Sequence, residues 1–151
     1  MTRPTVYEFA GGDQAFLALA AATTERCIAD PELNHPFGQP MSPRHNESLA
    51  AYWAEVFGGP ARYSESLGGH SGMLELHAGH GSPVEWGDRF EACFSAALDD
   101  AELPDDPEFR KVMHEYMHWA TREVNGYGPV GSRVEPGRPM PHWSWDGLQP
   151  D

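Results

Sequence analysis

The chain of 151 residues is long enough for one domain with a substantial core and too short for two such domains. Hydrophobic residues make up 40% of it, and no apolar run approaches the roughly 20 residues that a membrane-spanning helix needs. The formal net charge is -13, so phosphate backbones and anionic membrane surfaces are repelled. Because the N-terminus also lacks a signal-peptide pattern, we expect a single-domain cytoplasmic protein that binds neither nucleic acid nor membranes.

Helical periodicity begins near the N-terminus. Apolar residues recur every three or four positions over residues 13–28, which predicts a first helix that Asp30-Pro31 stops. Ser42-Pro43 supplies a capping residue and a first-turn proline for a second helix, and Gly58-Gly59-Pro60 ends that helix. Cys27 lies near the end of the first helix, and it is too far from Cys93 in sequence to indicate a paired metal motif. We interpret both cysteines as small buried residues.

The second half of the chain adds three further helices. Residues 61–71 are predicted to form a loop, followed by a short helix that ends at His77. Residues 82–85 match a capping box and predict the start of the fourth helix. Asp106 caps a last helix over residues 107–125. Five helices and no convincing strand predict an all-α fold.

The composition changes to glycine and proline after residue 125. We therefore predict a folded domain over residues 1–125 and an extended C-terminal extension over residues 126–151. Two interpretations of the extension remain open. It is either a disordered end, or Trp143 and Trp145 dock on the domain or on a second subunit of a homodimer.

A motif in the last helix, His114-Glu115-Tyr116-Met117-His118, matches the H-E-x-x-H pattern of zinc proteases. At about 100° per residue, His114 and His118 lie opposite the apolar face of that helix, so we expect them to face water. Third-ligand candidates such as Glu135 and His142 lie in the glycine-proline extension. A zinc hydrolase is thus a distant alternative, followed by a helical binding module without a cofactor.

His77 ends a short apolar turn and is followed by glycine. It would present an imidazole nitrogen to the space that Met73 and Leu74 line, as an iron porphyrin requires. By itself the signal is weak, because a lone histidine on an apolar face is more often a core residue.

An ordered series of short motifs resembles the group II truncated haemoglobins, of an actinobacterial type with a C-terminal Pro/Trp tail. The resemblance extends from Tyr7 to about Asn125 and implies a two-over-two helical sandwich. The motifs are Tyr7-Glu8-x-x-Gly11-Gly12, Asp30-Pro31-Glu32-Leu33, Phe37, Gly58-Gly59-Pro60, Tyr63-Ser64, His77 and Leu103-Pro104-x-Asp106-Pro107-Glu108-Phe109.

The resemblance implies that His77 is the metal ligand, binding the iron of haem b (iron protoporphyrin IX) on the proximal side. It places Thr24 and His45 on the distal side, where both are candidates to contact a bound gas, although no residue is assigned a catalytic role. Phe90 stands where the group typically has a tryptophan donor, and Phe37 where some relatives have a tyrosine. The resemblance therefore implies a less polar pocket with His45 as the main donor.

The remaining haem contacts also follow from the resemblance. Tyr63 would lie near the haem propionates, but Leu76 stands where relatives often have a basic residue. Thr24 has an alternative role, in which its hydroxyl bonds its own helix backbone. The full set of implied haem contacts is His77, Phe37, His45, Leu49, Tyr52, Tyr63, Met73, Leu74 and Phe90.

The implied function is binding of dioxygen or another diatomic gas at ferrous iron, for storage, transport or sensing. Nitric oxide dioxygenation is an extension of it that needs an electron-donating reductase. The alternative is a specialised haem enzyme that acts on peroxide or a small nitrogen-containing substrate, because Thr24 and Phe90 leave room on the distal side.

Overall fold

Helices form almost all of the regular structure in the computed structural model, which describes residues 3–34 and 42–150. In chain order the described helices are α1 (Val6–Ala10), α2 (Gly12–Ala29), α4 (His45–Val56), α5 (Arg62–Ser66), α6 (Gly69–His77), α7 (Glu85–Asp100) and α8 (Pro107–Gly126). The all-α prediction is confirmed. Among the described residues, no helix combines the length and the apolar character that crossing a membrane requires.

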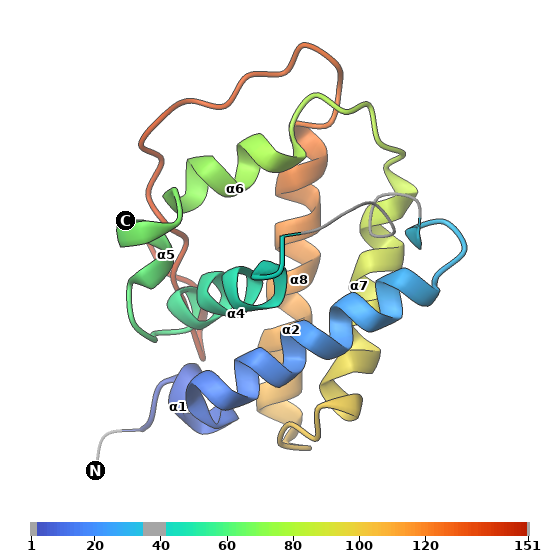
Figure 1. Ribbon diagram of the computed structural model, residues 1–151. Helices are drawn as coiled ribbons and strands as arrows, with labels where there is room; N and C mark the ends of the chain where they lie inside the picture. The colour runs from blue at the N-terminus through green and yellow to red at the C-terminus, as the bar shows by residue number, and fades with distance from the viewer. Residues whose placement is uncertain (1–2, 35–41, 151) are drawn as a thin grey trace.

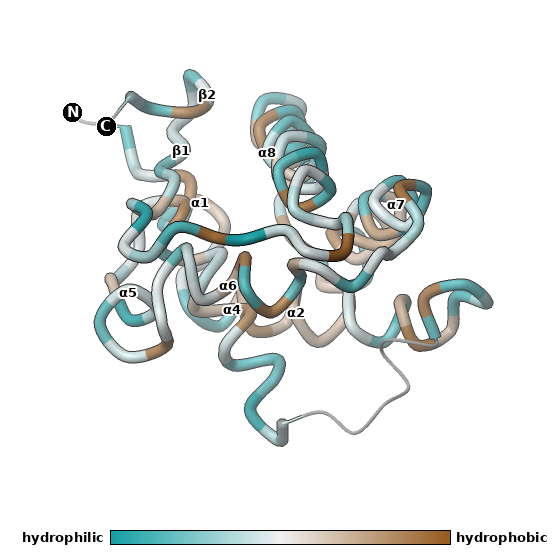
Figure 2. The backbone as a smooth tube through the Cα atoms, turned by 90° about the horizontal axis from the view of Figure 1, so that it is seen from above, coloured by the Kyte–Doolittle hydropathy of each residue, from teal (hydrophilic) through white to brown (hydrophobic). Residues whose placement is uncertain are grey.

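The long helices pack in two layers. Helix α2 packs against both α4 and α7, and α7 packs against α8. Figure 2 shows α7 and α8 on one side and α2 and α4 on the other, with α6 beside α4. This is the two-over-two helical arrangement that the sequence motifs imply.

Aromatic side chains join the two layers in the core. Phe57 at the end of α4 contacts Phe16 of α2, with ring centroids 6.0 Å apart, and Tyr116 of α8, at 5.0 Å. Trp53 of α4 packs edge-on against Phe94 of α7 at 5.0 Å. Such pairs add about 0.5–1.5 kcal/mol each to the stabilisation from buried area. The core therefore holds α4 firmly against α2, α7 and α8.

The bounds of the two longest predicted helices agree with the structure. Helix α2 extends one residue beyond the predicted range at each end, and α8 extends one residue beyond it at its C-terminus. Asp106 caps α8 as predicted, since its carboxylate accepts a hydrogen bond of 2.9 Å from the Phe109 amide. Both cysteines are buried as predicted, and Cys27 and Cys93 belong to one apolar cluster with Leu33.

The structure corrects the interpretation of residues 61–71 as a loop. Helix α5 lies within that range, and α6 begins at Gly69, before its predicted start. Tertiary contacts stabilise α5, because Tyr63 is buried and the Ser64 amide donates a hydrogen bond of 2.9 Å to the buried carboxylate of Glu55. A five-residue helix has too little periodicity to be recognised from sequence.

Two predicted helix starts are also wrong in detail. Helix α7 is preceded by Val84 and has no side-chain cap, so the predicted capping box over residues 82–85 does not form. Helix α4 begins at His45, because Ser42 caps a preceding turn by accepting a hydrogen bond of 3.1 Å from the Arg44 amide. The capping box that does form joins Thr5 and Glu8 at the start of α1, a helix that the sequence analysis missed.

The C-terminal extension docks on the folded domain. It passes over α6 and returns toward α1 (Figure 1), ending in an antiparallel hairpin of β1 (Trp143–Ser144) and β2 (Gly147–Leu148), where Trp143 pairs with Leu148. Trp143 is 8% exposed and packs edge-on against Tyr116. The Trp145 indole donates a hydrogen bond of 2.9 Å to the Pro4 carbonyl. Of the two interpretations that the sequence left open, docking on the domain is the one found.

Candidate functional site

His77 is the last residue of α6, and its ring is held by its own helix. Its Nδ1 lies 2.8 Å from the Met73 carbonyl oxygen, one turn earlier. A carbonyl only accepts hydrogen bonds, so in the neutral imidazole the proton sits on Nδ1 and the Nε2 lone pair is left for another partner. His77 is also exposed, and Ala78 ends the helix in an extended conformation. The ring is therefore in the tautomer that a metal ligand requires.

The rest of α6 supports this end of the helix. Leu74 is completely buried, and Met73 is half-buried against the main core cluster. At its start, Gly68 and Gly69 have φ angles of 98° and 64°, which only glycine adopts readily. The chain can thus turn sharply from α5 into α6 and place the apolar side chains beneath His77.

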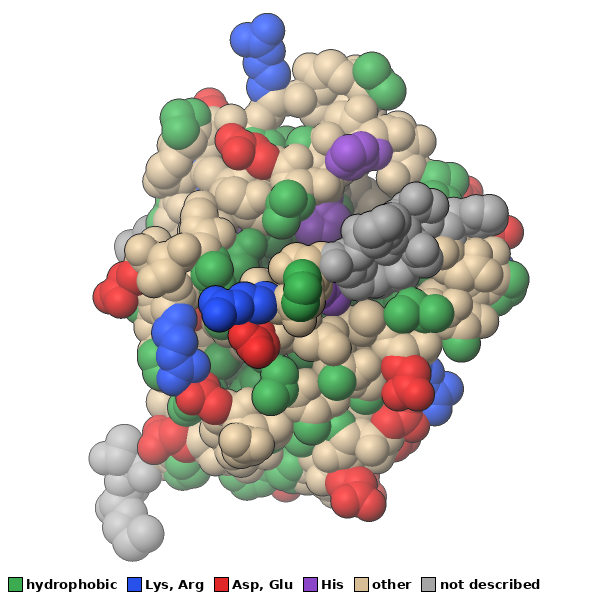
Figure 3. Space-filling view, viewed as in Figure 1, with side chains coloured by type: hydrophobic (Ala, Val, Ile, Leu, Met, Phe, Trp, Pro, Cys, Tyr) green, Lys and Arg blue, Asp and Glu red, His purple; other side chains and the backbone are tan. Residues whose placement is uncertain are grey.

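His45, the first residue of α4, lies near His77. Burial, and after it the charge of His77, lowers the pKa of the His45 imidazole below its ordinary value. The two histidines, on α4 and α6, are thus close enough to interact electrostatically. Figure 3 shows histidine side chains gathered on this face of the molecule. The structure thus brings together the predicted proximal and distal histidines.

Thr24 lies beside the same region, on α2. It is 7% exposed, and its hydroxyl donates a hydrogen bond of 2.7 Å to the Asn46 side-chain oxygen. Its neighbour Thr23 instead bonds the helix backbone, at the Leu19 carbonyl, 2.8 Å away. The alternative in which Thr24 bonds its own backbone is therefore not the one found, and Thr24 ties α2 to the residue that follows His45.

The next predicted contacts continue along α4 into the core. Leu49 is half-buried, whereas Tyr52 is 4% exposed and packs edge-on against Tyr63, with ring centroids 5.1 Å apart. Burial raises the pKa of both tyrosines, so both hydroxyls stay protonated at neutral pH. The Tyr52 hydroxyl forms a hydrogen bond of 2.7 Å with His70. The two tyrosines thus pack together beside α6, and Tyr52 is bonded to that helix.

Phe90 is half-buried between the main core cluster and the smaller cluster of Cys27, Leu33 and Cys93. Trp86, one turn earlier on α7, packs on the smaller cluster. The predicted contact Phe37 lies outside the described residues.

The H-E-x-x-H histidines lie apart from these residues. His114 and His118 are exposed on α8, as predicted, and their Nδ1 atoms lie 3.1 Å from the Ser95 hydroxyl and 3.3 Å from a Glu91 carboxylate oxygen on α7. Within the described part of the chain, no three or more His, Cys, Asp or Glu side chains gather as a metal-binding group. Among the described residues the two histidines therefore have no third ligand beside them, which disfavours a zinc hydrolase.

Comparison with protein families identifies the family of this chain. The profile of the bacterial-like globins matches residues 5–122, which is most of the chain. The protein belongs to the bacterial-like globin family. Membership implies haem binding and haem-based gas binding, and the predicted resemblance to the truncated haemoglobins is confirmed.

Solved structures similar to this globin include two bacterial haemoglobins that are at least 30% identical to it. The haemoglobin of Chloroflexus aurantiacus is 32% identical, with 81% of this chain and 98% of that chain covered and a TM-score of 0.69. The thermostable haemoglobin of Thermobifida fusca is 30% identical, with 80% and 96% covered and a TM-score of 0.66. The group II truncated haemoglobin of Bacillus anthracis, at 19% identity, shares the fold, with 91% and 98% covered and a TM-score of 0.72. Comparison with curated proteins yields no match.

The donor chemistry of this globin fits a haem. Haem iron takes one neutral imidazole from the protein on the proximal side, and the His77 tautomer leaves Nε2 for that role. Three residues that support the region were not predicted from the sequence, namely Asn46, His70 and Glu123. Two of them had a signal in the sequence, since Asn46 adjoins His45, and His70 precedes His77 by seven residues, or about two helical turns. Glu123 had none.

Proposed function

We propose that this globin binds haem b through His77 and takes a diatomic gas, dioxygen first, on the side that His45 and Thr24 border. The Met73 carbonyl that fixes the His77 tautomer is the observation that carries the proposal. When bound, haem would supply a ferrous iron that can take up a gas, and His77 would be the residue that holds it. The haemoglobin of Chloroflexus aurantiacus, at 32% identity, supports the same role here.

His45 acts as the polar group on the gas side. Its lowered pKa keeps the imidazole neutral at pH 7, so the ring carries one N–H donor and one lone pair. The Thr24 hydroxyl donates its hydrogen bond to the Asn46 side-chain oxygen, which leaves lone pairs on the Thr24 oxygen as acceptors. Asn46 is thereby fixed next to His45, which restricts where the start of α4 can move. We propose that His45 donates to the gas and that Thr24 steadies this end of α4 through Asn46.

Phe90 makes the proposed pocket less polar, because a phenyl ring has no hydrogen-bond donor. With His45 as the principal donor, dioxygen is held by about one hydrogen bond's net stabilisation, of order 1 kcal/mol. We therefore propose reversible gas binding as the basic activity. Nitric oxide dioxygenation with an electron-donating reductase is a finer role that turnover assays with nitric oxide test, and assays with peroxide test the alternative of a specialised haem enzyme.

The visible spectrum tests the proposal directly. Protein purified with haem, or reconstituted with one equivalent of it, is expected to show a Soret band that shifts when the reduced protein takes up carbon monoxide. Colourless protein that resists reconstitution and contains stoichiometric zinc would overturn the proposal. An identical Soret shift in a His77→Ala variant would show that the protein binds haem but that His77 is not the ligand.

A further inference from the structure

Helix α6, which carries His77, is too short to hold its own position. It has nine residues, and isolated helices shorter than about 12 residues are marginal in water. The direction of the His77 ring therefore depends on whatever anchors α6 to the rest of the protein. Two sets of contacts do so, and both come from residues early in the helix.

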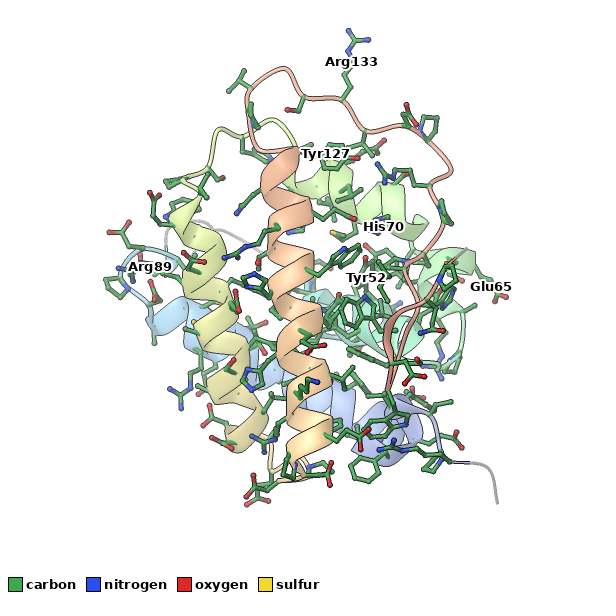
Figure 4. The ribbon with its side chains drawn as sticks, turned by 180° about the vertical axis from the view of Figure 1, so that it is seen from behind. Tyr52, Glu65, His70, Arg89, Tyr127 and Arg133 are labelled. Carbon is green, nitrogen blue, oxygen red and sulfur yellow. The ribbon has the colours of Figure 1, made fainter. Side chains whose placement is uncertain are left out.

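The first anchor is His70, which is 3% exposed and touches two other helices. Its Nδ1 shares a hydrogen bond of 2.7 Å with the Tyr52 hydroxyl on α4, and its Nε2 lies 2.5 Å from a carboxylate oxygen of Glu123 on α8. Figure 4 shows Tyr52 and His70 side by side next to α8. Because His70 and His77 are about two turns apart, they lie on the same side of α6. Fixing one ring therefore limits the rotation of the other.

The second anchor is Ser71, which is 7% exposed and binds the C-terminal extension. Its hydroxyl donates a hydrogen bond of 2.6 Å to the Glu135 carbonyl and accepts one of 3.0 Å from the Arg138 amide. The extension thus runs beside α6 and bonds this hydroxyl both as an acceptor of its proton and as a donor to its oxygen. Figure 1 shows the segment after α8 passing over α6.

The loop that follows His77 is tied to the same extension. The Gly79 amide donates to the Tyr127 carbonyl at 2.9 Å, and the Gly81 amide donates to the Gly128 carbonyl at 2.8 Å. Tyr127 is the first residue after α8 (Figure 4). The chain is therefore held just beyond His77 as well as at His70 and Ser71.

All of these anchors except Tyr52 come from residues 123–138, which lie beyond the segment that matches the globin family, 5–122. We infer that residues 123–138 are a positioning element of the proximal site, which sets the direction of His77 by holding α6 at His70, at Ser71 and in the following loop. The inference rests on the proposed role of His77 as the iron ligand. It makes the extension part of the gas-binding machinery of this chain.

Ser71→Ala tests the anchor to the extension, and Ser66→Ala, at an exposed serine that ends α5, is the matched control. In the haem-free protein, amide hydrogen exchange over residues 69–77 is expected to accelerate about fivefold in Ser71→Ala, since one net hydrogen bond corresponds to a change of that size. Exchange in the core of α2 and α8 should stay unchanged. Equal exchange in Ser71→Ala and Ser66→Ala would overturn the inference.

Resonance Raman spectroscopy of the haem-loaded protein gives a measurement that a purely structural role of Ser71 would leave unchanged. The iron–histidine stretching band in the resonance Raman spectrum of the reduced protein is expected to shift or broaden in Ser71→Ala but not in Ser66→Ala. A parent protein without an iron–histidine band would overturn the proposed function and the inference with it. A parent with the band and a Ser71→Ala variant with the same band would overturn the inference alone.

The His70 anchor is dissected by variants that keep one contact each. In His70→Gln the amide nitrogen replaces Nε2, so the contact with Glu123 is kept. In His70→Asn the amide group takes the place of Nδ1, so the contact with Tyr52 is kept. Both are expected to change the band less than His70→Leu, which loses both contacts. Glu123→Gln, which keeps an acceptor oxygen, should restore most of what Glu123→Ala loses. Identical bands in the parent, His70→Leu and Glu123→Ala would contradict the inference.

Discussion

Helices α6 and α8 each carry two histidines on one side, seven residues apart on α6 and four apart on α8, and the two pairs have different surroundings. On α6, His70 is buried between two helices, and His77 has its Nδ1 held by a backbone carbonyl. On α8, His114 and His118 have the spacing of a zinc motif but are exposed and contact side chains of α7. Spacing along a helix determines which side chains share a face. The neighbours of that face determine what it can bind.

The largest difference expected between the two helices is in haem retention. His77→Ala is expected to lose normal haem retention, because no other residue of α6 offers a nitrogen in the same place. His114→Ala should retain the haem of the parent. Soret absorbance per protein after gel filtration measures both. The contrast breaks down if His114→Ala loses as much haem as His77→Ala.

The second expected contrast lies within α8, whose buried face has a structural role. Tyr116 is 1% exposed and packs on Phe57 and Trp143, so Tyr116→Ala should lower the free energy of unfolding by about 3–5 kcal/mol. Glu115, whose side chain is 52% exposed, should lose less than about 0.5 kcal/mol on change to Ala. Urea unfolding of the haem-free variants gives both values. Similar losses would show that the packing on Tyr116 contributes little.

Buried and exposed histidines provide a third contrast. His70→Ala leaves the Tyr52 hydroxyl and the Glu123 carboxylate without their partner, and Glu123 is partly solvated, so we expect a loss of about 2 kcal/mol. His118→Ala removes one surface contact with Glu91 and should cost less than about 0.5 kcal/mol. The same urea measurement applies. A larger loss for His118→Ala than for His70→Ala would reverse the ranking argued from burial.

The smallest expected effect is on the gas side of the proposed pocket. His45→Ala removes one hydrogen-bond donor, so dissociation of dioxygen is expected to accelerate about five- to tenfold. Stopped-flow mixing of the oxygenated protein with dithionite and carbon monoxide measures the rate. The control is Glu47→Ala at an exposed position of α4, for which we expect the parent rate. An unchanged rate in His45→Ala would remove its role as the donor.

The parts of this globin that could be predicted from sequence are those that depend on local rules. The periodicity of α2 and α8 predicted both helices to within about a turn, and Asp106 marked the start of α8 correctly. The exposure of His114 and His118 also followed from helix geometry alone. Local rules failed at residues 82–85, where a matching capping box does not form, and at α5, which is too short to show a period.

The prediction of the site from sequence depended on the resemblance to a known protein family. His77 stood out as one candidate, and ordered motifs related to a family raised it above the zinc motif. The supporting contacts could not be predicted in this way. Thr24 meets Asn46 across 22 positions of sequence, and Ser71 meets Glu135 across 64. Such pairings depend on how helices cross, which no local pattern encodes.

By itself, the sequence determined that this chain forms amphipathic helices, that its cysteines are buried, and that His77 ends an apolar turn. Hydrophobic periodicity and capping act between residues a few positions apart, so these features can be predicted from the sequence. Only the tertiary structure decided that the extension docks on the domain and that His70 and Ser71 are anchored by residues 123–138. The burial of a short helix depends on partners distant in sequence, and their contacts exist only once the layers have packed.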